Sequence, residues 1–172
     1  MTIALKDFIH AVPDFPKPGI LFRDISPLLG HPEAFSSAVS CMEEKLHALR
    51  PSVVVAIESR GFVFGAPTAM RVGLPLVLVR KPGKLPGNKE RIEYQLEYGI
   101  DALEIKSGMI QPGARVAIID DVLATGGTAY ATAELVRKVG GVVAGFVFLA
   151  ELMALGGRDR LPGESVSSLV QF

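Results

Sequence analysis

Four short runs of apolar residues along the chain predict buried β-strands. They cover residues 52–57, 74–79, 115–119 and 142–149. The runs are continuous and rich in Val and Ile, and polar residues do not alternate with the apolar ones. This pattern is typical of strands that are buried on both faces of a sheet.

Segments with helical periodicity lie between the predicted strands. Residues 33–49 place apolar side chains at steps of three and four, which predicts an amphipathic helix. Its apolar stripe consists of Phe35, Ala38, Val39, Met42, Leu46 and Leu49. Residues 64–71 and 128–139 are further helix candidates, and Gly140 and Gly141 end the second of them. The alternation of strand and helix predicts an α/β fold with a central parallel β-sheet flanked by helices.

Two segments depart from this alternation. Residues 13–29 are dense in Pro and aromatic residues, so we expect them to lie over the sheet as a small cap, outside its strands. Residues 80–99 are polar and contain glycines, and a loop of this length in a compact domain is typically a functional lid. No repeat, low-complexity tract or linker is present, so the sequence predicts one domain over residues 1–172.

Composition narrows the class of protein. The 172 residues include 18 Lys plus Arg and 18 Asp plus Glu, and this balance argues against a protein that binds nucleic acid through a basic face, although a basic pocket stays compatible with it. The one cysteine, Cys41, cannot form an internal disulfide, which is typical of a reducing compartment. Neither a signal peptide nor a membrane span is evident. We therefore expect a cytoplasmic protein without membrane or nucleic-acid partners.

The most informative run covers residues 116–129, VAIIDDVLATGGTA. Ligands of parallel sheets bind just beyond the strand ends, where this run places two acids and then a glycine turn into a helix. Glycines allow close backbone approach, and the N–H groups of a helix N-terminus favour an anion. The acids are placed to accept hydrogen bonds from a sugar diol. The predicted ligand is thus a phosphate with a ribose, and the candidate residues are Asp120, Asp121, Ala124, Thr125, Gly126, Gly127 and Thr128.

A structural alternative exists for the same run. In that alternative Asp120 and Asp121 cap a strand end, and the glycines turn the chain into a helix whose N-cap is Thr128. The hydrophobic strand, acid pair and Thr-Gly-Gly-Thr in series favour the ligand site over this alternative. The chain lacks GxxxxGK[ST], and no GxGxxG follows the first strand. The main sequence motifs that would indicate an ATPase or a dinucleotide-binding protein are therefore absent.

Residues 116–129 resemble the phosphoribosyl diphosphate (PRPP) signature of type I phosphoribosyltransferases. Further segments, in order, resemble the adenine phosphoribosyltransferase family: PDFPKPGILFRDISPLL, ESRGFVFG, RKPGKLP and EYQLEYGIDALEI, followed by ELMALGGRDRL and SLVQF. The resemblance implies the type I fold, with a hood over the base formed by about residues 1–30 and a mobile lid. It also implies purine salvage, in which adenine and PRPP give AMP and diphosphate.

The resemblance also implies roles for individual residues. Asp120 and Asp121 would hold the ribose hydroxyls, and residues 124–128 the 5′-phosphate. The diphosphate would meet Ser59, Arg60, Gly61, Lys81 and Lys84, and guanidinium and ammonium groups suit its charge. Adenine would lie between Phe22 and Val122, with the backbone of Leu21 and Arg23 reading its edge. For Phe22, ordinary core packing is nearly as good an interpretation.

The implied catalytic residues are Arg60, Glu97 and Tyr98, the last two in the lid. Glu97 would accept the purine proton or stabilise charge, and the sequence leaves the choice open. Mg²⁺ would bind mainly through PRPP and water, with no protein metal site. The resemblance also implies a homodimer. One departure is Glu58, where the family commonly has Asp.

Three other functions remain compatible with the sequence. The first is transfer to another 6-aminopurine or to a 6-oxopurine, because backbone geometry decides base selection. The second is a PRPP-sensing regulator without catalysis, although no helix-turn-helix candidate is present at the termini. The third is a nucleotide-binding structural protein.

Overall fold

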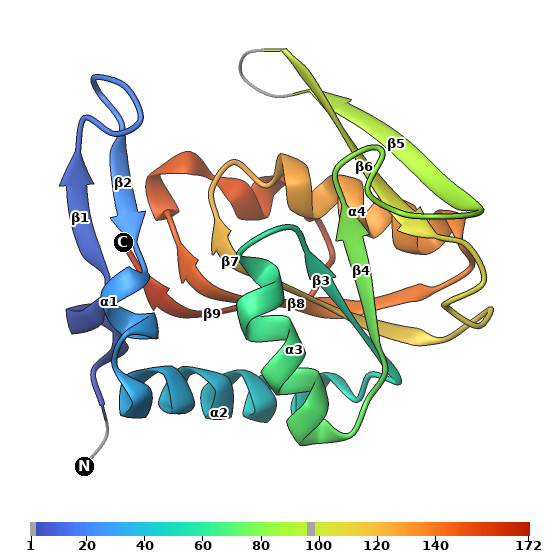
Figure 1. Cartoon of the computed structure of the whole chain (residues 1–172), viewed down its shortest axis with the longest axis horizontal. Coiled ribbons are helices and arrows are strands. Elements are labelled where there is room, and N and C mark those ends of the chain that lie inside the picture. Colours follow the sequence, from blue (N-terminus) through green and yellow to red (C-terminus); the bar gives the residue numbers. More distant parts are fainter. Residues whose placement is uncertain (1–2, 96–98) are drawn as a thin grey trace.

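A computed structural model describes residues 3–95 and 99–172 of the chain. Its main sheet has seven strands in the order β5-β6-β4-β3-β7-β8-β9 (Figure 1). The strands are β3 (Val53–Ile57), β4 (Leu76–Arg80), β5 (Lys89–Gln95), β6 (Ile100–Lys106), β7 (Arg115–Leu123), β8 (Val142–Glu151) and β9 (Val166–Gln171). The main helices are α2 (Pro32–Leu49), α3 (Gly61–Val72) and α4 (Gly127–Lys138). The predicted α/β fold with its helix-flanked sheet is confirmed.

The centre of the sheet is parallel. Strand β3 pairs in parallel with β4 and β7, and β8 pairs in parallel with β7 and β9. All four predicted strands exist, as β3, β4, β7 and β8. The predicted end of the third strand at residue 119 is wrong, because β7 continues through the acid pair to Leu123. The reason is its long partner, since Val122 and Leu123 still pair with Ala150 and Glu151 of β8.

One edge of the sheet is antiparallel. Strands β5 and β6 form a hairpin, and β6 also pairs antiparallel with β4. The sequence predicted a loop over residues 80–99, and this is wrong for residues 89–95, which form β5. In β5, Ile92 and Tyr94 are more buried than the neighbouring Arg91 and Glu93, but the many charged residues of the strand hid this alternation in the sequence. The predicted mobility of this segment stays a prediction.

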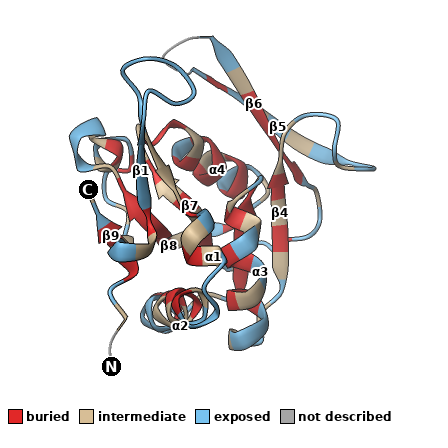
Figure 2. Ribbon diagram, turned by 60° about the vertical axis from the view of Figure 1, so that its left-hand side comes forward, coloured by how far each residue is buried: buried red, intermediate tan, exposed pale blue. Residues whose placement is uncertain are grey.

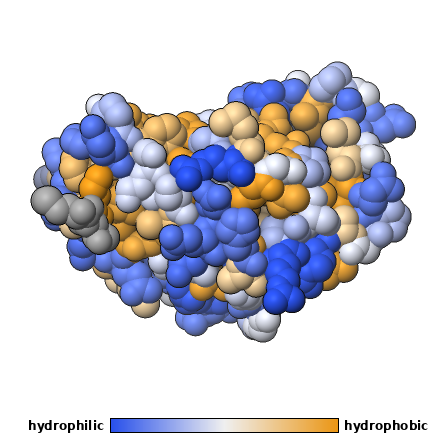
Figure 3. Space-filling model, turned by 90° about the horizontal axis from the view of Figure 1, so that it is seen from below, coloured by the Kyte–Doolittle hydropathy of each residue, from blue (hydrophilic) through white to orange (hydrophobic). Residues whose placement is uncertain are grey.

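Helices cover both faces of the sheet. Helices α2 and α3 pack on one face and α4 on the other, and the buried positions are concentrated on the strands and the inner sides of the helices (Figure 2). Every residue of β3 is buried, and Val53, Val55 and Ile57 belong to one core while Val54 belongs to the core on the opposite face. The face of the molecule seen from below in Figure 3 carries many hydrophilic residues, with apolar patches between them. None of the helices within the described residues is long and apolar enough to cross a membrane.

The predicted helices are present, and local chemistry explains their bounds. Helix α2 begins at Pro32, whose fixed φ suits a first helical position. The His31 side chain caps it, because Nδ1 accepts a hydrogen bond from the Ala34 N–H at 3.3 Å. Helices α3 and α4 begin at Gly61 and Gly127, slightly before the predicted starts at residues 64 and 128.

The N-terminal hood lies outside the strands of the main sheet, as predicted, but its two strands stand beside that sheet and not over it (Figure 1). It comprises a 3₁₀ turn η1 (Leu5–Phe8), strands β1 (His10–Pro13) and β2 (Leu21–Asp24), and α1 (Ser26–Leu29). The sequence did not predict that β1 and β2 pair antiparallel. The ring of Phe172 attaches the hood to the end of the main sheet, because the Arg23 guanidinium carbon lies 3.9 Å and the Lys6 Nζ 4.9 Å from its centre.

Candidate active site

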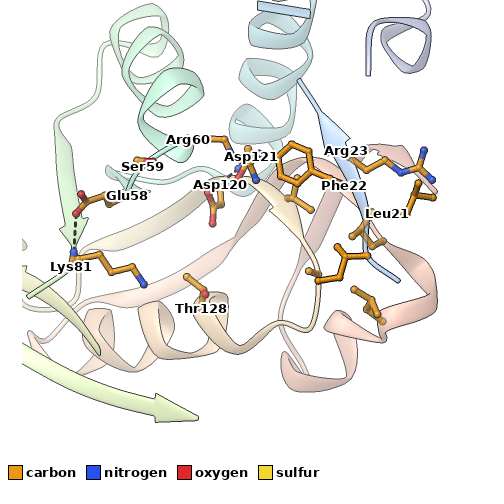
Figure 4. A pocket seen from close by; sticks show the side chains of 15 residues that line it. Leu21, Phe22, Arg23, Glu58, Ser59, Arg60, Lys81, Asp120, Asp121 and Thr128 are labelled. Carbon is orange, nitrogen blue, oxygen red and sulfur yellow. Dashed lines mark hydrogen bonds and ion pairs between the residues drawn. The ribbon is translucent and has the colours of Figure 1, made fainter. Parts of the chain in front are cut away.

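A pocket of about 500 Å³ opens at the C-terminal ends of the parallel strands (Figure 4). Five parts of the chain line it: the hood, the turn after β3, the end of β4, the end of β7 with the loop and the start of α4 that follow, and the segment after β8. The lining residues are Ile20, Leu21, Phe22, Arg23, Glu58, Ser59, Arg60, Lys81, Asp120, Asp121, Val122, Ala124, Thr128, Leu152 and Leu155. Most of the predicted site residues are thus brought together in one cavity.

The acid pair lies at the centre of this lining. The Asp121 N–H donates to Asp120 Oδ1 at 2.9 Å, and Asp121 Oδ2 lies 2.7 Å from Arg60 Nε. Burial and the neighbouring Asp121 carboxylate raise the pKa of Asp120. Burial also raises the pKa of Asp121, while the Arg60 guanidinium opposes this rise. Two crowded carboxylates favour a ligand that donates hydrogen bonds to them, and a ribose diol does so.

Gly61, one of the five residues predicted to meet the diphosphate, is not among the residues that line the pocket. It starts α3 against β7, where a Cβ atom would lie 2.8 Å from Asp120 Oδ1 and 3.0 Å from the Ile119 carbonyl oxygen. Only glycine allows this approach, so Gly61 sets the distance between the turn after β3 and the acid pair.

The loop from Ala124 to Thr128 forms a smaller cavity next to the first. It measures about 80 Å³ and is lined by Asp120, Phe148 and every residue from Val122 to Ala129. Gly126, with a φ of 81°, caps α4, which begins at Gly127. The alternative N-cap at Thr128 is therefore wrong, because the glycines themselves form the turn and first residue of the helix. The N-terminus of α4 faces this cavity and suits an anion.

The three predicted cationic side chains all have carboxylate partners. Arg60 pairs with Asp121, Lys84 with Glu58, and Lys81 with Asp101 of β6. Lys81 lines the pocket, whereas Lys84 does not and instead contacts Glu58, which does.

Glu58 is held by several donors at the end of β3. Its Oε2 accepts hydrogen bonds from the Lys81 N–H at 2.8 Å and from Arg80 Nε at 3.4 Å, and its side chain is 8% exposed. Burial alone raises the pKa of Glu58, but the hydrogen bonds from Lys84, Lys81 and Arg80 outweigh it and lower the pKa to about 2. Glu58 therefore connects β3 to the turn after β4.

This arrangement gives a pH-dependent prediction for Glu58→Gln. A lowered pKa means that the ionised group stabilises the folded state above the ordinary value of 4.5, and that this contribution is lost as the pH falls toward about 2. We expect Glu58→Gln to lower the free energy of unfolding at pH 7 by about 1–2 kcal/mol and by less at pH 3. Urea unfolding at both pH values measures this, with the exposed Glu44→Gln as control. An equal loss at pH 7 and pH 3 contradicts the prediction.

The hood supplies part of the apolar lining of the pocket. Phe22 lines it, 5.2 Å from the Arg60 guanidinium carbon and 5.1 Å, centre to centre, from the ring of Phe15. Leu21 and Val122 also line it. The Arg23 side chain lies over the ring of Phe172, and the predicted contact of its backbone with a base stays a prediction.

Sequence reasoning did not identify several residues of the site. Leu152, Leu155 and Ile20 line the pocket, and the first two belong to the ELMALGGRDRL segment, which carried a resemblance but no assigned role. The Tyr94 hydroxyl lies 3.3 Å from Thr128 Oγ1, and it falls in the EYQLEYG segment. The predicted catalytic residues Glu97 and Tyr98 lie outside the described residues.

The segment after β8 packs against the loop from Ala124 to Thr128, which we call the phosphate loop after its predicted ligand. In its turns η2 (Met153–Leu155) and η3 (Gly157–Arg160), a Cβ atom on Gly157 would lie 2.4 Å from the Ala124 carbonyl oxygen. Two hydrogen bonds from Arg158 to Glu151, at 2.6 and 2.7 Å, hold the segment in place. The Glu151 side chain is 3% exposed, so the carboxylate of this ion pair is buried, while the Arg158 side chain is 40% exposed. The phosphate loop thus rests against a fixed surface.

Comparison with known proteins agrees with this geometry. The family "Phosphoribosyl transferase domain" matches residues 31–167. The chain is 55% identical to an adenine phosphoribosyltransferase of Carboxydothermus hydrogenoformans, over 98% of this chain and 99% of that protein. An adenine phosphoribosyltransferase of Clostridium perfringens is 52% identical, with 99% of each chain covered.

Solved structures give the same result. The crystal structure of adenine phosphoribosyltransferase from Thermoanaerobacter pseudethanolicus matches with a TM-score of 0.95 and 48% identity, covering 98% of both chains. The Saccharomyces cerevisiae enzyme, solved with an imino-altritol bisphosphate and adenine, matches with a TM-score of 0.90 and 39% identity over 94% of both chains. The family match and these identities over nearly the whole chain show that this chain belongs to the adenine phosphoribosyltransferase family.

Proposed function

We propose that this protein transfers the 5-phosphoribosyl group of PRPP to adenine and releases AMP and diphosphate. The observation that carries this proposal is the position of the acid pair, which lies between the phosphate loop and the apolar hood within one pocket. A ribose held by Asp120 and Asp121 would therefore have its phosphate on one side and its base on the other. The volume of about 500 Å³ lies in the range of small-molecule sites.

The proposed ligand positions follow from the chemistry of each part. The 5′-phosphate meets the backbone N–H groups at the start of α4, and Thr128 adds a hydroxyl donor. The base lies against Phe22 and Val122, an apolar environment that suits a planar ring. The diphosphate faces Ser59, Arg60 and Lys81, and Lys84 adds charge from beside Glu58.

The proposed reaction forms a bond from a purine ring nitrogen to the anomeric carbon of ribose and breaks the bond from that carbon to diphosphate. Positive charge develops on the ribose, and fixed charges around it supply most of the catalysis. Glu97 is our candidate for accepting the purine proton or stabilising charge. For Tyr98 we propose either a hydrogen bond to phosphate or packing within the closed lid. Positioning both substrates in one pocket replaces a bimolecular encounter.

We propose Mg²⁺ as the cofactor. Mg²⁺ prefers oxygen ligands and keeps several waters, and it neutralises charge on a departing diphosphate. The Asp120 carboxylate, a hard oxygen group, lines the pocket, which fits an ion held mainly by PRPP oxygens and water. We further propose a cytoplasmic homodimer of one-domain subunits over residues 1–172, acting in purine salvage without nucleic-acid or membrane partners.

An assay of the purified protein with Mg²⁺ and PRPP tests the proposed function. Adenine, hypoxanthine, guanine and xanthine are offered separately, and nucleotide and diphosphate are quantified. We expect AMP and an equal amount of diphosphate with adenine, and little product with the 6-oxopurines. Product from another purine contradicts the assigned base, and PRPP binding without any product favours a regulator.

A further inference from the structure

The Lys81 ammonium group, which faces the pocket, already has a partner within the protein. It forms an ion pair with Asp101 Oδ2 on β6 and lies 3.5 Å from the Tyr94 hydroxyl on β5. Figure 4 shows the Lys81 side chain extending across the pocket in the direction of Thr128. An anion that binds Lys81 must therefore compete with Asp101.

The β5–β6 hairpin also reaches the phosphate loop. Tyr94 and Asp101 are opposite each other in the antiparallel register, and the Tyr94 hydroxyl donates to Asp101 Oδ2 at 3.2 Å. The same hydroxyl lies 3.3 Å from Thr128 Oγ1, and the Tyr94 residue is 9% exposed. A continuous set of contacts thus joins Lys81, Asp101, Tyr94 and Thr128, between the proposed diphosphate and 5′-phosphate positions.

Three carboxylates pair with the cations around the pocket, and they differ in exposure. The side chains of Asp121 and Glu58 are 7% and 8% exposed, whereas that of Asp101 is 27% exposed. A carboxylate that leaves its cation needs water or other donors in exchange, because an unpaired buried charge is costly. Asp101 has access to water, and it also accepts a hydrogen bond from the Ala102 N–H at 2.8 Å. It is the carboxylate that leaves its cation at the lowest cost.

We infer that Asp101 is an exchangeable internal anion, which holds Lys81 while the diphosphate position is empty and releases it when the diphosphate of PRPP binds. The inference rests on the proposed function, which places diphosphate at Lys81. The exchange is one of ion pairs, and Lys81 keeps its proton throughout. After the reaction, Asp101 takes Lys81 back as diphosphate leaves. Asp101 is thus a positioning residue that adjusts diphosphate affinity without touching the substrate.

Calorimetric titration with magnesium diphosphate tests the inference on the full chain. We expect Asp101→Asn to bind diphosphate about two- to fivefold more tightly than the unmodified protein, since exposed ion pairs contribute little and the competitor is removed. Asp101→Ala changes affinity in the same direction. The matched control is Glu93→Gln on the same hairpin, which removes an exposed charge paired with Arg91 and leaves the affinity unchanged.

A double-mutant cycle separates exchange from a general effect of charge. Lys81→Met weakens diphosphate binding, and in that background Asp101→Asn has no further effect. Tightening of equal size with and without Lys81, or unchanged or weaker binding in Asp101→Asn, overturns the inference and leaves the proposed function intact. If the unmodified protein binds no diphosphate and forms no AMP, both the inference and the proposed function are overturned.

Discussion

Replacing Asp120 by Asn is expected to stabilise the unliganded protein and to abolish most of its affinity for PRPP. The raised pKa means that the folded state binds this proton more tightly than the unfolded chain does. The cost of the buried charge is therefore absent below the ordinary value of 3.8 and fully present above the raised pKa. At pH 7.5 we expect the free energy of unfolding to rise by about 1 kcal/mol, or about 2–4 °C in thermal midpoint.

The functional loss has a separate cause. An Asn keeps the oxygen that accepts from the Asp121 N–H but replaces a charged acceptor of a ribose hydroxyl by a neutral one and a donor. We expect PRPP affinity to fall about 10²-fold. Calorimetry of unfolding at pH 7.5 and pH 5, with PRPP titration, measures both effects, and the exposed Glu44→Gln is the control. A lower thermal midpoint for Asp120→Asn at pH 7.5 contradicts the burial argument.

Replacing Gly157 by Ala is expected to displace the phosphate loop without changing any residue of that loop. The added methyl group would lie 2.4 Å from the Ala124 carbonyl oxygen and 2.9 Å from Leu123 Cδ1, so one of the two segments must move. Overpacking of this kind costs about 1–3 kcal/mol of stability. A displaced phosphate loop also misplaces the ribose, and we expect kcat/KM for PRPP to fall about ten- to a hundredfold.

Gly30→Ala provides the matched control for this substitution. Gly30 has a φ of −75°, and a Cβ atom there would meet its nearest neighbour at 3.4 Å, an ordinary contact. We expect little change in kcat/KM or in the thermal midpoint for this variant. Steady-state kinetics with varied PRPP and thermal unfolding compare the two. If Gly157→Ala and Gly30→Ala behave alike, the segment after β8 does not set the position of the phosphate loop.

The parallel centre of the fold was predictable because its residues are buried on both faces. Strand β3 is apolar throughout, and α2 repeats its apolar residues at helical spacing. Such patterns are local, and periodicity detects them. The edges were not predictable in this way. Strand β5 combines charged residues with Ile92 and Tyr94, and its pairing with residues 100–106 is specified by a partner across a turn.

In the candidate site, too, residues that are contiguous in the sequence were predictable and residues brought together by the fold were not. Asp120, Asp121 and the Thr-Gly-Gly-Thr turn are contiguous, so their chemistry was evident from the sequence. Leu152 and Leu155 lie about 30 residues further along the chain and reach the pocket only because β8 pairs with β7. The partners of Glu58 and Lys81 were also missed, because side-chain pairs across separate strands leave no periodic signal. Contiguous chemistry was therefore predictable, and chemistry assembled by topology was not.

The charged character of β5 has a consequence for association between molecules. Within residues 3–95 and 99–172, β5 is the last strand at its side of the sheet, so none of the described strands pairs with its outer backbone groups. Such an edge is a template for pairing with strands of other chains. Here Lys89, Arg91 and Glu93 alternate along it as exposed charged side chains, which makes pairing with another strand costly. The charges that concealed this strand from periodicity analysis thus protect the enzyme against edge-to-edge aggregation.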